Sequence, residues 1–224
     1  MKGKLFHLAT FEPHLFGTTI SHFVRPEGMN FTTKEGKAWR DAHGDLPILK
    51  ADEYASILGA ATALQQDAFL GPMLRAKGRA EVTVMAKHER TGLPLKMRAD
   101  WLTEDVNGRA WILDAKSIAS LDDFPWSARD FGYDTQSVFY TDTLALADVP
   151  NAGFLFAVVE LEPPFEVRLE TISAESQIAA RELYERDLDR LAECSAADFW
   201  PRKYPEIGRL TIPRRGGEQR EEIL

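Results

Sequence analysis

The sequence of 224 residues lacks the features on which several protein classes depend. Cys194 is its one cysteine, which excludes an internal disulfide or a multi-cysteine zinc site and fits a reducing cytoplasm. No run approaches the roughly 18 consecutive apolar residues that span a membrane. Charged residues and Pro13 interrupt the opening MKGKLFHLATFEPHLF, so we expect no export signal. No glycine-rich phosphate loop occurs, which disfavours Rossmann and P-loop enzymes.

The composition is that of an ordinary globular protein. Hydrophobic residues make up 44% and charged residues 28%, which supports a core and a solvated surface and argues against disorder. The length suits one domain. The formal net charge of −8 argues against an overall basic nucleic-acid binder. It does not exclude one, because binding depends on the local field and a metal site adds carboxylates of its own.

The spacing of apolar residues predicts a helical first part and a second part that contains a sheet. The expected helices of the first part cover residues 2–11 and about 34–42, and a longer one begins at Asp52 as N-cap and breaks at Gly71-Pro72 before a last turn to Lys77. Period-two alternation then predicts strands over 80–86, 95–102 and 109–117, joined by short turns into an antiparallel meander. After a loop rich in Asp, Pro and Ser, the expected elements are a helix over 134–147, strands over 153–161 and 165–170, and a long amphipathic helix over 174–192.

Together these elements predict an α/β fold, with a central mixed β-sheet flanked by helices. The sheet combines the three-strand meander with the two later strands, and the strand over 153–161 is apolar throughout, as expected when both faces are buried. We expect one domain over residues 1–200, with a helical part over 1–77 and a catalytic core over 78–200. The tail over 201–224 is expected to be partly flexible.

Charged residues stand at the end of the apolar third strand, in the run Asp114-Ala115-Lys116. Asp114 and Lys116 share one face, because successive strand side chains point to opposite faces. Asp100 lies fourteen residues earlier on the neighbouring strand, and the Asn-Gly turn between them can place it beside Asp114. A surface ion pair is the alternative explanation of an isolated Asp-x-Lys.

Two neighbouring carboxylates repel each other, and a divalent cation relieves that repulsion. Asp100 and Asp114 are therefore predicted to hold Mg²⁺, with Mn²⁺ as a substitute. The ion would polarise a phosphodiester and lower the pKa of a bound water. Lys116 would orient that water or stabilise the developing charge.

Asp100, Asp114-x-Lys116 and a following helix with Gln136 and Tyr140 together resemble the PD-(D/E)xK nuclease superfamily. More narrowly, the chain resembles the phage exodeoxyribonuclease VIII (RecE-type) nucleases and related phage proteins. The upstream Asp of that family follows a short basic run, which Lys96-Met97-Arg98-Ala99 matches, although Ala99 stands where the family has proline. A helical Gly-x-x-x-His pattern followed by Glu-Pro matches Gly3 to His7 and Glu12-Pro13.

The resemblance implies roles for these residues. His7, Asp100 and Asp114 would bind the metal, with a helix-end histidine of no special role as the alternative for His7. Gln136 would act in catalysis by orienting the water or a substrate phosphate, with a hydrogen bond on the helix face as the alternative. Lys96 and Arg98 would contact the substrate phosphates, with scattered surface charge as the alternative. Tyr140, which shares a helix face with Gln136, would pack beside Lys116, touch DNA or lie in the core.

Other residues keep two interpretations. Glu81 opens the first strand of the meander and is either a further metal-facing carboxylate or a solvated one. The remaining histidines show no ligand spacing. We expect four tryptophans to anchor the core or loops rather than to stack on bases: Trp101, Trp111, Trp126 and Trp200.

The predicted function is Mg²⁺-dependent hydrolysis of DNA phosphodiester bonds. The resemblance implies an exonuclease acting on linear double-stranded DNA in phage-type recombination, in the cytoplasm of a bacterial host. It also implies a ring-shaped homo-oligomer and a single-strand annealing partner protein. One alternative is a catalytically silent nuclease fold that binds partners or DNA, and another is a metal-dependent hydrolase acting on a different substrate.

Overall fold

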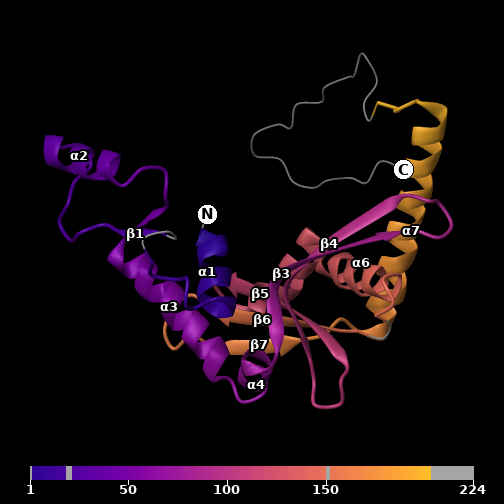
Figure 1. The fold of residues 1–224 in the computed structure, drawn as a ribbon, viewed down its shortest axis with the longest axis horizontal. Coiled ribbons are helices and arrows are strands. Elements are labelled where there is room, and N and C mark those ends of the chain that lie inside the picture. The colour runs from indigo at the N-terminus through magenta and orange to yellow at the C-terminus, as the bar shows by residue number, and fades with distance from the viewer. Residues whose placement is uncertain (1, 19–21, 150–151, 203–224) are drawn as a thin grey trace, which may run out of the picture.

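The computed structural model describes residues 2–18, 22–149 and 152–202. The predicted flexible tail lies, from residue 203 onward, outside the described residues. The architecture is a mixed sheet with helices on both faces (Figure 1). In the described part of the chain, no helix combines the length and apolarity that crossing a membrane requires.

The sheet has five strands in the order β3-β4-β5-β6-β7, which confirms the predicted α/β fold. Its strands are β3 (Gly78–Lys87), β4 (Pro94–Glu104), β5 (Ala110–Ile118), β6 (Gly153–Glu160) and β7 (Val167–Glu170). The first three form the predicted antiparallel meander, and β6 then runs parallel to β5 and antiparallel to β7. Seven of the eight β6 residues are buried, as expected for an apolar strand at the centre of a covered sheet.

Helices cover the two faces with separate hydrophobic cores. On one face lie α1 (Lys2–Phe11), α3 (Ala51–Gln66) and α4 (Leu70–Arg75), packed on Leu113 and Ala115 of β5. On the other lie α5 (Phe124–Phe131) and α6 (Tyr133–Ala145), packed on Ile112, and α7 (Ala174–Ala197) lies outside α6. Alternation along β5 therefore directs Leu113 and Ala115 into one core and Ile112 into the other.

A short peripheral segment stands away from the sheet in Figure 1. It contains α2 (Lys34–Ala42), as predicted, and two short parallel strands, β1 (Phe23–Val24) and β2 (Ile48–Leu49), which the sequence did not predict. Two residues in each strand give too short a pattern for alternation to be recognised.

Two predicted boundaries of α3 are wrong. The helix begins after Lys50, whose backbone N–H donates to the Glu53 carboxylate at 3.0 Å, so Asp52 already lies inside the first turn. The break comes at Asp67 rather than at Gly71-Pro72. The Asp67 side chain accepts hydrogen bonds from the backbone N–H groups of Phe69 and Leu70 at the start of α4.

The segment expected to be a loop after β5 contains α5. Pro125 stands in the first turn of this helix, where a missing N–H costs nothing, and Gly132 ends it with φ +64°. Pro125 and the neighbouring aspartates thus mark a helix start, not an irregular connection. This helix changes the surroundings of Trp126, as described below.

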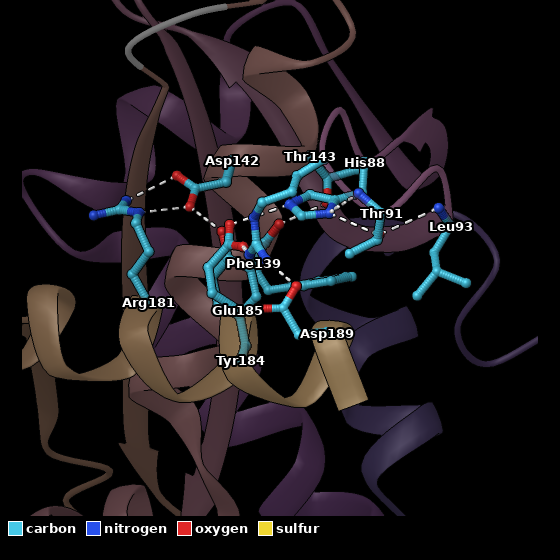
Figure 2. Close-up of polar contacts among 11 residues, drawn as sticks. His88, Thr91, Leu93, Phe139, Asp142, Thr143, Arg181, Tyr184, Glu185 and Asp189 are labelled. Atoms are coloured by element: carbon cyan, nitrogen blue, oxygen red, sulfur yellow. Dashed lines mark hydrogen bonds and ion pairs between the residues drawn. The ribbon is translucent and has the colours of Figure 1, made fainter. Parts of the chain in front are cut away.

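A polar network fixes the tip of the β3–β4 hairpin to α7 (Figure 2). His88 Nε2 lies 3.2 Å from the Glu185 carboxylate, and Arg90 forms ion pairs with Glu185 and Asp189. Next to them, Asp142 of α6 accepts hydrogen bonds from Arg181 at 2.7 and 2.8 Å and from the Tyr184 hydroxyl. We call this group the α7 network; its members are His88, Arg90, Asp142, Arg181, Tyr184, Glu185 and Asp189.

Candidate functional site

The register of the meander places Asp100 between two other carboxylates. Trp101 pairs with Ala80 of β3 and with Leu113 of β5. Because both pairings are antiparallel, Asp100, one residue before Trp101, lies level with Glu81 and with Asp114. The β4–β5 pairing ends at Trp101–Leu113, so the two strands part where the two aspartates stand. Asp100 and Asp114 thus lie on adjacent strands, as the sequence predicts.

His7 lies near Asp100 and belongs to α1, the helix that packs on the face of β5 with Leu113 and Ala115. The neighbouring residues Leu5, Phe6 and Ala9 are buried and fix α1 on the sheet. The His7 Nδ1 atom lies 3.4 Å from Asp100 Oδ2, and its Nε2 atom lies 2.8 Å from the Ala115 carbonyl oxygen. Burial of the imidazole opposes its protonation, but the nearby Asp100 carboxylate prevails and raises the pKa of His7.

Glu81 completes a three-residue cluster with His7 and Asp100. One ligand atom from each of these residues lies within 4.8 Å of the other two. Glu81 has φ +52°, a left-handed conformation that costs free energy in a strand residue other than glycine. Its carboxylate Oε2 lies 2.9 Å from Nε of Arg98. We call His7, Glu81 and Asp100 the metal-facing cluster.

Asp114 forms a second, more deeply buried group with Lys116 and Gln136. Its Oδ1 lies 2.6 Å from Lys116 Nζ, and its Oδ2 accepts a hydrogen bond from Gln136 Nε2 at 2.7 Å. Lys116 Nζ also lies 3.5 Å from Gln136 Oε1 and 4.5 Å from the centre of the Tyr133 ring. Gln136 thus orients both charged groups from α6.

The pKa of Asp114 is raised above the ordinary value of an aspartate. Its side chain is only 4% exposed. Burial and the nearby charge of Asp100 raise the pKa of Asp114 to about 6, while Lys116 and His7 act in the opposite direction. Two carboxylates that disfavour each other's ionisation would both gain from a bound cation.

The donor set fits a divalent metal ion. Within the described ranges, the buried side-chain atoms without a hydrogen-bond partner are Asp100 Oδ2, Trp101 Nε1 and Asp114 Oδ1, the last of them beside the Lys116 ammonium. Two of these three are carboxylate oxygens, of Asp100 on β4 and of Asp114 on the adjacent strand β5. Carboxylate oxygens are preferred ligands of Mg²⁺ and Mn²⁺, and an imidazole suits transition metals such as Mn²⁺.

A surface hollow of about 430 Å³ opens beside the metal-facing cluster. Lys4 and Arg98 contribute cationic side chains to its lining, next to His7, Glu81 and Asp100. A substrate anion can therefore approach the carboxylates past positive charge. This hollow is the route that connects the cluster with solvent.

The predicted substrate contacts on the hairpin and on α6 lie in different surroundings. Lys96 and Arg98 are exposed on one face of the β3–β4 hairpin. Tyr140 packs against Phe154 in the core with ring centres 6.1 Å apart, and Tyr133 takes the position beside Lys116 instead. The sequence carried a signal for Tyr133, which lies three residues before Gln136 and so shares its helix face.

Trp126 does not anchor the core or a loop. It is 62% exposed on α5 and stacks beside Arg129 at 5.0 Å, so that expectation is wrong. The prediction failed because it placed Trp126 in a loop. Trp101 fits the prediction better, because it stacks on Phe11 within the core between α1 and the sheet.

Comparison with known proteins supports the fold. Residues 1–208 match a family model described as a PDDEXK-like domain of unknown function, DUF3799. The chain is similar to a protein from Eubacterium rectale described as a "putative exonuclease", at 16% identity and a TM-score of 0.57, over 80% of this chain and 71% of that chain. The structure of SSO0001 is 15% identical over 87% of this chain and 85% of that chain, but its TM-score of 0.35 is too low to carry an argument. Among curated proteins there is no match.

Proposed function

Because the chain belongs to the PDDEXK-like family DUF3799, we propose that it is a metal-dependent nuclease that hydrolyses DNA phosphodiester bonds. The observation that carries the proposal is the arrangement of Asp114, Lys116 and Gln136 beside a second group of metal-ligand type, His7, Glu81 and Asp100. The Eubacterium rectale protein of similar fold, described as an exonuclease candidate, adds support for this class of reaction.

Each residue has a role that follows from its position. A divalent cation held by His7, Glu81, Asp100 and Asp114 would supply Lewis acidity to a phosphodiester oxygen and would acidify a water molecule. Lys116 is 20% exposed and lies at the edge of the buried group, where its ammonium stabilises negative charge that develops on the phosphate. Gln136 holds the Asp114 carboxylate and the Lys116 ammonium in one orientation.

The outer face of the β3–β4 hairpin is the proposed contact surface for the DNA backbone. Cross-strand neighbours on this face are Thr83 with Arg98 and Met85 with Lys96, and Lys87 follows next to the turn. These side chains are exposed, and the row begins directly beyond Glu81 and Asp100. A cationic row of this kind suits phosphates even though the whole chain has a net charge of −8.

The finer assignments come from the resemblance. We propose Mg²⁺ as the ion, Mn²⁺ as its substitute and linear double-stranded DNA as the substrate of an exonuclease in phage-type recombination. A ring-shaped oligomer, a single-strand annealing partner and a place in the bacterial cytoplasm belong to the same proposal. So does the division into a helical part and a catalytic core within one domain.

The test is digestion of end-labelled linear duplex beside closed circular DNA, with Mg²⁺, Mn²⁺ or EDTA. We expect metal-dependent loss of the linear DNA alone. The variant Asp114→Asn keeps the size of the side chain and should abolish cleavage, whereas Glu104→Gln, an exposed carboxylate at the far end of β4, should cleave normally. Survival of all DNA at high concentrations of folded protein would refute the nuclease and favour a silent, partner-binding fold. Cutting of the circles would show an endonuclease.

A further inference from the structure

The metal-facing cluster and the outer hairpin face meet at one ion pair. Arg98 Nε lies 2.9 Å from Oε2 of Glu81. Arg98 pairs across the hairpin with Thr83, so Glu81 is its diagonal neighbour, within reach of a long side chain on the same face. Glu81 therefore belongs to two groups of residues, the cluster on one side and the cationic row on the other.

The Glu81 carboxylate has competing partners. One of its oxygens lies within 4.8 Å of the ligand atoms of His7 and Asp100. The same carboxylate is held by the Arg98 guanidinium. A carboxylate that shares its charge with a guanidinium is a weaker metal ligand, because the metal must compete for the same negative charge.

The backbone conformation of Glu81 indicates that its position serves the metal-facing cluster and not the ion pair with Arg98 alone. The strain of φ +52° lies at the one β3 residue level with Asp100, whereas its neighbours Ala80 and Val82 keep regular pairing. Strain of this kind persists where the surrounding structure enforces it, and it concentrates at functional sites. An exposed ion pair with Arg98 alone is too weak to explain such a conformation.

Arg98 has room to move. Its side chain is 60% exposed and lines the hollow of about 430 Å³ beside the cluster. Release from Glu81 would leave its guanidinium in the opening through which a phosphate approaches. A guanidinium binds phosphate through two parallel hydrogen bonds, which suits it to that role better than a lysine.

We propose that Arg98 is an exchangeable counter-ion of Glu81. Without metal, the guanidinium neutralises Glu81 and keeps the cluster from accumulating negative charge. Binding of a divalent cation at His7, Glu81 and Asp100 displaces Arg98, which then contacts the substrate phosphate. The inference rests on the proposed function for the identity of that phosphate, but the competition for Glu81 is a property of the free protein.

The experiment measures metal affinity without DNA. Mn²⁺ is titrated calorimetrically into the wild type, Arg98→Gln and Lys4→Gln. Lys4→Gln is the matched control, because it removes the same charge from the lining of the same hollow and leaves the ion pair between Arg98 and Glu81 in place. Since an exposed ion pair is weak, we expect Arg98→Gln to lower the Mn²⁺ dissociation constant about two- to fivefold, and Lys4→Gln to change it clearly less.

A second measurement tests the released guanidinium. Affinity for a fluorescein-labelled duplex is measured in Ca²⁺ and in EDTA, where Ca²⁺ offers a hard cation for oxygen ligands. Arg98→Gln should weaken duplex binding more in Ca²⁺ than in EDTA, because only the cation frees Arg98 in the wild type. Equal loss in both buffers would overturn the exchange.

The outcomes separate the inference from the proposed function. If the wild type binds no Mn²⁺, and Asp100→Asn behaves identically, the metal-dependent function itself fails. If the wild type binds Mn²⁺ but Arg98→Gln and Lys4→Gln shift the affinity equally, charge in the hollow acts at long range and the exchange alone is refuted. Thermal melts establish that each variant is folded, as expected for exposed positions.

Discussion

The candidate site and the α7 network are built from the same kinds of side chain. Each combines three carboxylates with two strong cations and a histidine, which at the candidate site are Glu81, Asp100, Asp114, Arg98, Lys116 and His7. In the α7 network every carboxylate has a named partner: Asp142 has Arg181 and Tyr184, Glu185 has His88 and Arg90, and Asp189 has Arg90. At the candidate site, Asp100 Oδ2 faces His7 at 3.4 Å and Asp114 Oδ1 faces Lys116 at 2.6 Å, but neither of these buried oxygens accepts a hydrogen bond.

The pKa shifts also differ between the α7 network and the candidate site. In the α7 network, Asp142 raises the pKa of Arg181 through a hydrogen bond, and burial together with Asp142 raises the pKa of Tyr184, so each donor keeps its proton. At the candidate site, burial and Asp100 bring the pKa of Asp114 to about 6, within reach of ordinary pH. Residue types do not distinguish the two groups of residues, whereas hydrogen bonding of the buried carboxylates and the pKa of Asp114 do.

Removing Lys116 should slow cleavage strongly while the fold is kept. Lys116→Ala removes the ammonium 2.6 Å from Asp114, and we expect cleavage to slow by about 10²–10⁴-fold. The pKa of Asp114 should rise further without its counter-ion. A carboxyl group with a raised folded-state pKa loses stabilisation as pH rises through that value, so the metal-free variant should melt at lower temperature at pH 8 than at pH 6. Lys34→Ala on exposed α2 is the control, and equal rates in the two variants would contradict the role of Lys116.

Lowering the pH should weaken metal binding. The pKa of Asp114 is about 6 and that of His7 is raised, and each must lose its proton to become a ligand. Mn²⁺ affinity should fall about tenfold per pH unit where the His7 proton alone competes, and more steeply below about pH 6, where the Asp114 proton competes as well. Calorimetric titrations at pH 5.0, 6.0 and 7.5 measure this slope. An affinity that stays constant across the range would show that neither group binds the ion.

The fold could be predicted largely because its signals are local. Alternation of apolar residues located β3, β4 and β5, and the continuous apolar run identified β6 as the buried central strand. The short turns then fixed the order of the meander, and that order alone brings Asp100 level with Asp114. The prediction missed α5, because Pro125 and aspartates are typical of loops as well as of helix starts.

The features that distinguish the two clusters could not be predicted, because they depend on contacts between distant residues. His88 shows no ligand spacing in the sequence, and its partner Glu185 lies 97 residues later. The left-handed backbone of Glu81 is a tertiary effect without a glycine to mark it. The position of Tyr133 beside Lys116 depends on α6 beginning at Tyr133, one residue before the predicted start, and sequence patterns fix such a boundary only to within a few residues.

Within the α7 network, Tyr184→Phe should destabilise the fold without touching activity. The hydroxyl donates to Asp142, and its loss leaves a partly buried carboxylate with one partner fewer. We expect a loss of about 1–3 kcal/mol in the free energy of unfolding, measured by urea denaturation, and unchanged cleavage per folded molecule. Arg186→Ala, which breaks only the exposed contact with Asp187, is the control and should change stability little. A cleavage defect in Tyr184→Phe would mean that the two clusters are coupled.

Removing the ion pairs of Arg90 at the hairpin tip should have the smallest effect on stability. Arg90 is 52% exposed, and Arg90→Ala removes its ion pairs with Glu185 and Asp189 but leaves the contact between His88 and Glu185 in place. Exposed ion pairs contribute about 0–1 kcal/mol, so the melting temperature should fall by only a few degrees. Amide exchange should quicken in the turn of residues 88–93 while the end of β4 near Asp100 stays protected, because the sheet holds that end independently. Faster exchange at Asp100 itself would show that the α7 network also rigidifies the candidate site, and the contrast between a structural and a reactive cluster would then describe two ends of one cooperative unit.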